Sequence, residues 1–98
     1  MKIVNTIEAE VTFAIGGRAQ LPIGTGYAPH LVVTGDNQWL GVRFLDFPTC
    51  GTFGEPCQVR IELLYPDRVD YGKLQKDMTF AVHEGPKIVA TGRVTNRG

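Results

Sequence analysis

The strongest constraint on the fold of this chain is a two-residue alternation of apolar and polar side chains. In segment 8–15 every second residue is apolar, with Ala9, Val11, Phe13 and Ile15 alternating with Glu8, Glu10 and Thr12. A β-strand turns successive side chains to opposite faces, whereas a helix repeats every 3.6 residues. This segment is therefore predicted to be a strand with one buried face.

The same alternation recurs in segments 57–65, 78–83 and 87–94. The residues predicted to face the interior are Cys57, Val59, Ile61, Leu63 and Tyr65, then Met78, Phe80 and Val82, and finally Ile88, Ala90, Gly92 and Val94. No window of 11 or more residues has a convincing helical period, so the chain is predicted to be all-β.

Two further apolar runs, 31–33 and 39–47, complete the predicted strands. The turn-forming residues Thr34 to Asn37 lie between these runs, and His83 to Pro86 lie between the last two strands, so each pair is predicted to form a hairpin. Segments 16–29, 48–56 and 65–77 lack alternation and are predicted to be connections, the last with room for one helical turn.

Six or seven short strands in 98 residues must bury their apolar faces against one another. We expect one domain, residues 1–98, folded as a small barrel or sandwich that leaves few free strand edges. Gly92 in a strand interior suggests a bulge or a barrel corner more than a contact with a partner.

Charge and composition narrow the environment and the partners. Ten basic and ten acidic residues cancel, whereas proteins that bind phosphate backbones usually carry a basic excess. No run of about 18 apolar residues is present, so no membrane span is expected. The first residues lack a signal-peptide pattern, which favours a cytoplasmic location with Cys50 and Cys57 as free thiols, although their spacing leaves a disulfide open.

The sequence contains no recognisable catalytic constellation. Phosphate-binding GxxxxGK[ST], GxSxG and HExxH motifs are all missing. His30 and His83 have no acidic or cysteine cluster beside them in the sequence, and His83 is expected to be a solvated surface residue. We therefore predict no enzymatic activity, no catalytic or metal-ligating residues, no cofactor and no nucleotide.

Several motifs occur in an order that resembles the C-terminal β-barrel, the third domain, of the elongation factor Tu family. They are the acidic-apolar start "EAEVTF", Gly16-Gly17-Arg18, the Gly-Tyr-x-Pro element at 26–29, Leu63 to Pro66, and "FAVHEGPKIVATGRV" at 80–94. The likeness covers about residues 8–95. The chain departs from the family's pattern in a longer link between Pro66 and Phe80, in Ala19 and Gln20 after the arginine, and in Pro86 at the closing turn.

The resemblance implies a six-stranded antiparallel barrel that does no chemistry. In the elongation factor this domain contacts the backbone of transfer RNA, the nucleotide-exchange factor and the GTPase domain, and the GTPase motifs are missing here. The candidate partner-binding or RNA-binding residues are Arg18, Gln20, His83, Glu84, Gly85, Lys87 and Arg93.

Two functions remain open on this reading. One is a stand-alone module that binds a protein partner, which the zero net charge favours. The other is a translation-related binder of tRNA-like RNA, which the retained Arg18 and the Glu84-Gly85 turn favour. Each of these residues also has a structural explanation, such as a surface ion pair for Arg18 or a hairpin tip for Glu84.

Overall fold

Six segments form strands, and each coincides with a predicted alternating or β-branched stretch. The computed structural model describes residues 5–14, 27–46, 53–65 and 70–96. Its strands are β1 (Thr6–Phe13), β2 (His30–Val33), β3 (Leu40–Asp46), β4 (Pro56–Leu63), β5 (Thr79–Glu84) and β6 (Lys87–Asn96). The described part of segment 65–77 contains turns and no helix.

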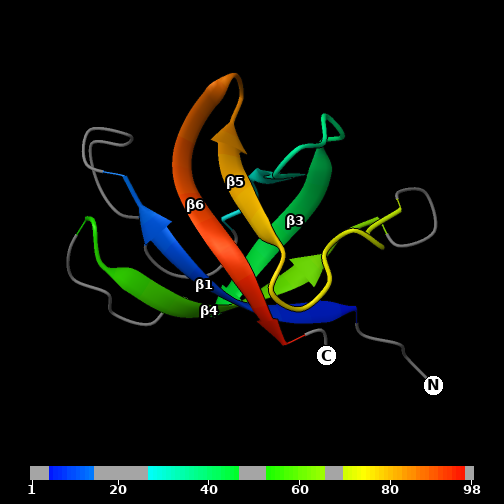
Figure 1. Ribbon diagram of the computed structural model, residues 1–98, viewed down its shortest axis with the longest axis horizontal. Coiled ribbons are helices and arrows are strands. Elements are labelled where there is room, and N and C mark those ends of the chain that lie inside the picture. The colour runs from blue at the N-terminus through cyan, green and yellow to red at the C-terminus, as the bar shows by residue number, and fades with distance from the viewer. Residues whose placement is uncertain (1–4, 15–26, 47–52, 66–69, 97–98) are drawn as a thin grey trace.

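The strands form a closed ring in which all neighbours are antiparallel. The order is β1-β4-β3-β2-β5-β6, and β6 returns to β1 (Figure 1). Closure pairs both edges of every strand, which removes the free edges that would otherwise invite aggregation. The prediction of a small antiparallel barrel of about six strands is confirmed. The described residues contain no helix with the length and apolarity that a membrane span would need.

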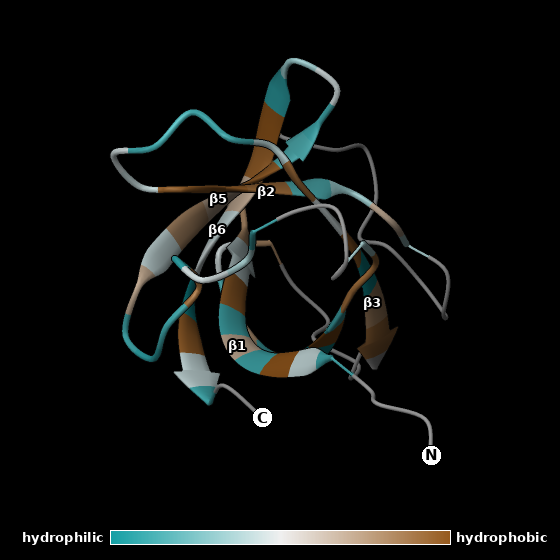
Figure 2. Cartoon of the chain, turned by 90° about the vertical axis from the view of Figure 1, so that its right-hand side faces the viewer, coloured by the Kyte–Doolittle hydropathy of each residue, from teal (hydrophilic) through white to brown (hydrophobic). Residues whose placement is uncertain are grey.

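The barrel interior is built from the predicted apolar faces. Along β1 the buried residues alternate with half-buried or exposed ones, as the brown and teal bands of Figure 2 show. The largest fully buried side chains are Phe13, Phe44, Phe80, Ile7, Leu31, Leu40, Ile61 and Leu74. No polar or charged residue of the described part is buried. Burial of apolar surface is thus the main stabilising contribution to this fold.

A β-bulge in β6 changes which residues face the core. The register with β5 passes from Val82 opposite Ala90 to His83 opposite Ile88, so Val89 has no register partner. Val89 and Ala90 are consequently both buried, whereas Ile88 turns outward and is 53% exposed. The prediction that Ile88 faces the interior is therefore wrong.

Two other residues predicted to face the interior lie just beyond the ends of their strands. Tyr65 follows β4 and is 49% exposed, and Met78 precedes β5 and is 39% exposed. The regular extended backbone that would turn these two side chains inward does not include Tyr65 or Met78. Ile15, predicted to be on the same face as Phe13, lies outside the described residues.

Cys57 and Gly92 also correct sequence-based expectations. Cys57 faces the core as predicted but is disulfide-bonded and not a free thiol. Cys50, the only other cysteine of the chain, lies outside the described residues. Gly92 sits at no register shift. A Cβ there would lie 2.6 Å from Cζ of Phe80 and 2.8 Å from the carbonyl oxygen of Glu10, so close packing explains this glycine instead of a bulge.

Candidate binding surface

Four of the seven candidate residues lie together at one end of the barrel, in the hairpin between β5 and β6. Glu84 pairs with Lys87, which leaves Gly85 and Pro86 as a two-residue turn. Gly85 has φ 60°, and proline holds its own φ near −65°, the combination of a type II′ turn. The sequence therefore folds this hairpin locally, and Lys87 stands exposed at its tip.

Arg93 does not join that group. It lies six residues further along β6, opposite Thr79 of β5 and Glu10 of β1. Its guanidinium forms an ion pair of 3.1 Å with Asp77. Arg18 and Gln20 lie outside the described residues, so their role as candidate partner-binding or RNA-binding residues stays a prediction.

Glu84 anchors the hairpin to the barrel. Its Oε2 accepts a hydrogen bond of 2.5 Å from the hydroxyl of Tyr27. The Tyr27 ring packs edge-on against Phe44, with centroids 5.2 Å apart, and lies 6.1 Å from the ring of Phe13. Tyr27 therefore packs into the barrel through its ring, and Glu84 has a structural partner inside the fold.

The sequence reading missed an aromatic surface on the outside of the same strands. His30 of β2 is the register partner of His83 of β5, and His83 is the register partner of Ile88 of β6. Trp39, from the connection between β2 and β3, packs against both imidazoles, with ring centroids 5.6 Å from His30 and 4.6 Å from His83. We call these four residues, His30, Trp39, His83 and Ile88, the Trp39 patch.

The Trp39 patch is unusually apolar for an outer barrel surface. Trp39 is 44% exposed and Ile88 is 53% exposed, although both side chains are large and apolar. His83, expected to be solvated, is only half-buried because the indole covers part of its ring.

Neighbouring residues extend this surface in two directions. On one side His30 pairs with Gly41 of β3, over which the exposed ring of Tyr65 lies; a Cβ on Gly41 would fall 2.6 Å from Cε2 of that ring. On the other side Val32 pairs with Ala81, and both are half-buried outward-facing residues. The patch is thus continuous with further apolar surface.

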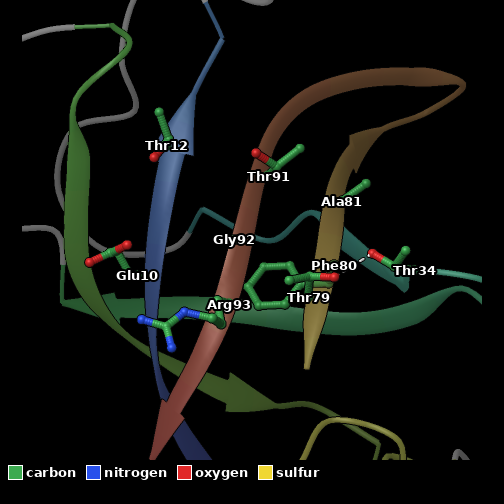
Figure 3. Close-up of a pocket in the computed structure, with 9 residues that line it drawn as sticks. All are labelled: Glu10, Thr12, Thr34, Thr79, Phe80, Ala81, Thr91, Gly92 and Arg93. Carbon is green, nitrogen blue, oxygen red and sulfur yellow. Dashed lines mark hydrogen bonds between the residues drawn. The ribbon is translucent and has the colours of Figure 1, made fainter. Parts of the chain in front are cut away.

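Beyond Ala81 the outer surface is hollowed into a shallow groove of about 410 Å³. The residues that line it are Glu10, Thr12, Thr34, Thr79, Phe80, Ala81, Thr91, Gly92 and Arg93. Figure 3 shows threonines on both sides of Gly92, whose missing side chain leaves room for the ring of the buried Phe80 at the floor of the groove. Thr34 and Thr79 are joined by a hydroxyl–hydroxyl hydrogen bond of 2.7 Å.

Three of the six lysines and arginines in the described part of the chain contact carboxylates. Besides Arg93 with Asp77, Arg43 contacts Glu62 at 2.5 Å and Lys73 contacts Asp36 at 3.2 Å. The backbone N–H of Asn37, with help from Lys73, lowers the pKa of Asp36. These pairs leave no concentrated positive field on the described part of the barrel.

A buried tyrosine fixes the segment that carries Tyr65. The hydroxyl of Tyr71 donates to the carbonyl of Gly41 at 2.6 Å and accepts from the backbone N–H of Tyr65 at 3.1 Å. Burial raises the pKa of this hydroxyl above its ordinary value. Tyr65 therefore starts from a rigid backbone position even though its ring is exposed.

No family model matches the chain, and no curated protein is similar to it in sequence. The resemblance to the third domain of elongation factor Tu therefore stays a prediction. The sequence carries one signal of the patch, because Trp39 begins the apolar run 39–47 two residues before Gly41 and therefore shares the face of Gly41 in an extended strand.

Proposed function

We propose that this domain is a non-enzymatic module that binds a protein partner through the Trp39 patch. The observation that carries the proposal is the exposure of Trp39 while its ring packs against two imidazoles. Tryptophan and tyrosine are enriched at the energetic centres of protein interfaces, where they fill pockets of the partner. Ile88 and Tyr65 supply further apolar area beside it.

The bracing of Trp39 favours binding for an entropic reason. Ordering a flexible side chain on association costs roughly 0.5–1.5 kcal/mol of binding free energy. Because Trp39 already contacts His30 and His83 in the free protein, most of this cost does not arise on binding. The closed barrel beneath the patch provides a rigid support, because each strand is paired on both edges. The groove next to Ala81 offers a place for a partner side chain or an extended segment.

Binding of tRNA-like RNA is the alternative, and the described surface supports it less. Affinity for RNA depends on cations that are free to neutralise phosphates. Three of the described cations form ion pairs, and Lys87 lies opposite Glu84 in the hairpin. The exposed aromatic rings could stack on bases, but the ion pairs leave few cations for a phosphate backbone.

The absence of enzymatic activity belongs to the same proposal. The two described groups with shifted pKa values are Asp36 and Tyr71, and both have structural causes, a turn N–H and burial. Neither lies in the groove, whereas catalytic groups with tuned pKa values usually lie in a cleft.

The cytoplasmic location expected from the sequence stays a prediction, and the disulfide of Cys57 argues against it. Disulfides persist in oxidising compartments and are rare in reducing ones. Thiol labelling of the protein directly in cells of its source would decide between the two. Rapid labelling without reductant would support the cytoplasm, and labelling only after reduction would support an oxidising compartment.

The proposal is tested by capture of binding partners from nuclease-treated lysate of the source organism. Immobilised wild-type protein is compared with a Trp39→Ala, Ile88→Ser variant and with a Met78→Ala variant as a matched control. Met78 is also an exposed apolar residue, but it lies outside the patch. We expect the same protein to be captured by the wild type and by the control, and to be lost from the double variant.

Two outcomes would contradict the proposal. One is a set of captured proteins that does not differ between the wild type and the double variant. The other is a titration with bulk tRNA that shows tight binding, steeply weakened by salt and unaffected by the Trp39→Ala, Ile88→Ser substitutions. Such salt-sensitive binding of tRNA would favour the RNA-binding alternative over a protein partner.

A further inference from the structure

The chain has only two histidines, and the fold places them directly opposite each other. His30 and His83 are 53 positions apart in the sequence and are register partners in β2 and β5. The Thr34 N–H donates to the Thr79 carbonyl, and antiparallel pairs alternate between hydrogen-bonded and non-hydrogen-bonded types. His30 lies four residues before Thr34, which is two complete alternations along the register. The histidines therefore form a hydrogen-bonded pair with Cα atoms about 5.5 Å apart.

Both imidazoles lie on the outer face, and one of them has an unsatisfied nitrogen. Side chains of directly opposed residues project from the same face of the sheet. Nδ1 of His83 is buried and makes no hydrogen bond. A buried polar atom without a partner costs free energy, which a ligand of this nitrogen would relieve. Trp39 packs against both rings and is the only tryptophan of the chain.

We propose that His30 and His83 form a two-histidine site for a transition-metal cation of the Zn²⁺, Ni²⁺ and Cu²⁺ class. Imidazole nitrogen is a preferred ligand of these cations, whereas Mg²⁺ prefers oxygen. Opposed imidazoles at this strand spacing can turn towards each other and chelate one ion. The indole of Trp39, which packs against both rings, then moves aside, and water fills the other coordination positions.

The site has two protein ligands and is therefore open. Among the described residues, no group of three or more histidine, cysteine, aspartate or glutamate side chains is placed to hold a metal. Glu84, next in sequence to His83, is hydrogen-bonded to Tyr27. Affinity then depends on the chelate effect, in which the second imidazole binds at a high effective concentration once the first is bound. This inference does not depend on the proposed function.

The test is a titration of the whole protein with Zn²⁺, followed by calorimetry and by Trp39 fluorescence. Zn²⁺ is redox-inert, so a change in fluorescence reports movement of the indole and not electron transfer. We expect saturable binding of one ion per chain, accompanied by a change in the emission of Trp39, and no response to Mg²⁺. Removal of either ligand, in His30→Asn or His83→Asn, is expected to weaken binding on the order of a hundredfold.

Two further measurements test Zn²⁺ binding by His30 and His83 without substituting either histidine. In the unaltered protein, the proton resonances of both imidazoles should shift together as Zn²⁺ is added, and no other histidine is present to confuse the assignment. Trp39→Phe should bind Zn²⁺ at least as tightly as the wild type, because a smaller ring must be displaced. No saturable binding, a shift of only one imidazole, or unchanged affinity in both His→Asn variants would overturn the proposal.

Discussion

Two glycines of this barrel face the same nominal steric conflict but should respond very differently to an added methyl group. A Cβ on Gly92 would lie 2.6 Å from Phe80 Cζ, and a Cβ on Gly41 would lie 2.6 Å from Tyr65 Cε2. Contacts below 3.0 Å force something to shift. The consequence depends on what can move, and that differs between the inside and the outside of the barrel.

Neither obstacle at Gly92 can yield easily. Phe80 is 1% exposed inside the close-packed core, and the second obstacle, at 2.8 Å, is the carbonyl oxygen of Glu10 in the paired strand β1. Overpacking of this kind destabilises by about 1–3 kcal/mol. For a domain of this size each kcal/mol lowers Tm by about 4–8 °C. Gly92→Ala should therefore be clearly less stable than the wild type.

Gly41→Ala should be close to neutral. The obstacle is the ring of Tyr65, which is 49% exposed and can rotate into solvent while its backbone stays fixed by Tyr71. Replacing glycine also restricts the unfolded chain, which stabilises by about 0.4–1 kcal/mol where the backbone conformation is permitted. The two effects oppose each other, so we expect a change in unfolding free energy within about 1 kcal/mol.

Urea unfolding followed by circular dichroism measures both variants on the same scale. The comparison is valid if the m-value stays constant, because the midpoint then reports stability alone. The double variant Gly41→Ala, Tyr65→Ala removes the obstacle at the outer site and should be no less stable than Tyr65→Ala. If Gly41→Ala were as destabilising as Gly92→Ala, the distinction between a yielding surface ring and an unyielding core would be wrong.

Three other predictions concern the buried hydroxyl, the turn carboxylate and the disulfide. Tyr71→Phe leaves the backbone N–H of Tyr65 without its partner, while the Gly41 carbonyl still accepts from the N–H of Leu64, and the variant should lose about 1–3 kcal/mol by urea unfolding. Because the pKa of Tyr71 is raised in the folded state, the stability that its hydroxyl contributes should be complete below about pH 10 and should be lost as the pH rises further. Tyr71→Phe should therefore lose less stability than the wild type in alkali, and equal losses would contradict this. The pKa of Asp36 is lowered, chiefly by the backbone N–H of Asn37, so the stability that this carboxylate contributes should disappear as the pH falls below about 4. Asp36→Asn should lack this acid-dependent loss of stability, and the same acid dependence in both proteins would refute the prediction. Cys57 should react with a thiol reagent in denaturant only after reduction, and immediate reaction would contradict the disulfide.

The local alternation was sufficient for the strands but not for their ends. Segments 8–13 and 57–63 have the predicted buried faces because a pleated strand repeats every two residues whatever its neighbours. Tyr65 and Met78 continue the same pattern in the sequence, yet each lies just outside a strand and is exposed. The carbonyl of Met78 still accepts a hydrogen bond from the N–H of Val94, but Asp77 before it has φ 74°, which interrupts the extended backbone. The pattern of one segment carries no information about such an interruption.

The bulge in β6 shows the same limit within a strand. In segment 87–94 the alternation is interrupted only by Val89, which lies between the apolar Ile88 and Ala90, and the structure inserts this residue as an extra one and turns Ile88 outward. Val89 is buried as a result, so a β-branched side chain replaces Ile88 in the core. Registers of this kind are chosen by the packing of the whole barrel.

What the sequence determined by itself was the class of the fold: alternating apolar faces, tight turns at Thr34–Asn37 and Gly85–Pro86, and too few residues for more than one shared core. What only the tertiary structure decided was which residues share its outer surface. His30, Trp39 and His83 come from separate segments, and they meet because β2 pairs with β5 across the closing barrel. Periodicity is a property of one segment, whereas strand order results from the burial of all six faces at once. The Trp39 patch is therefore a consequence of that order.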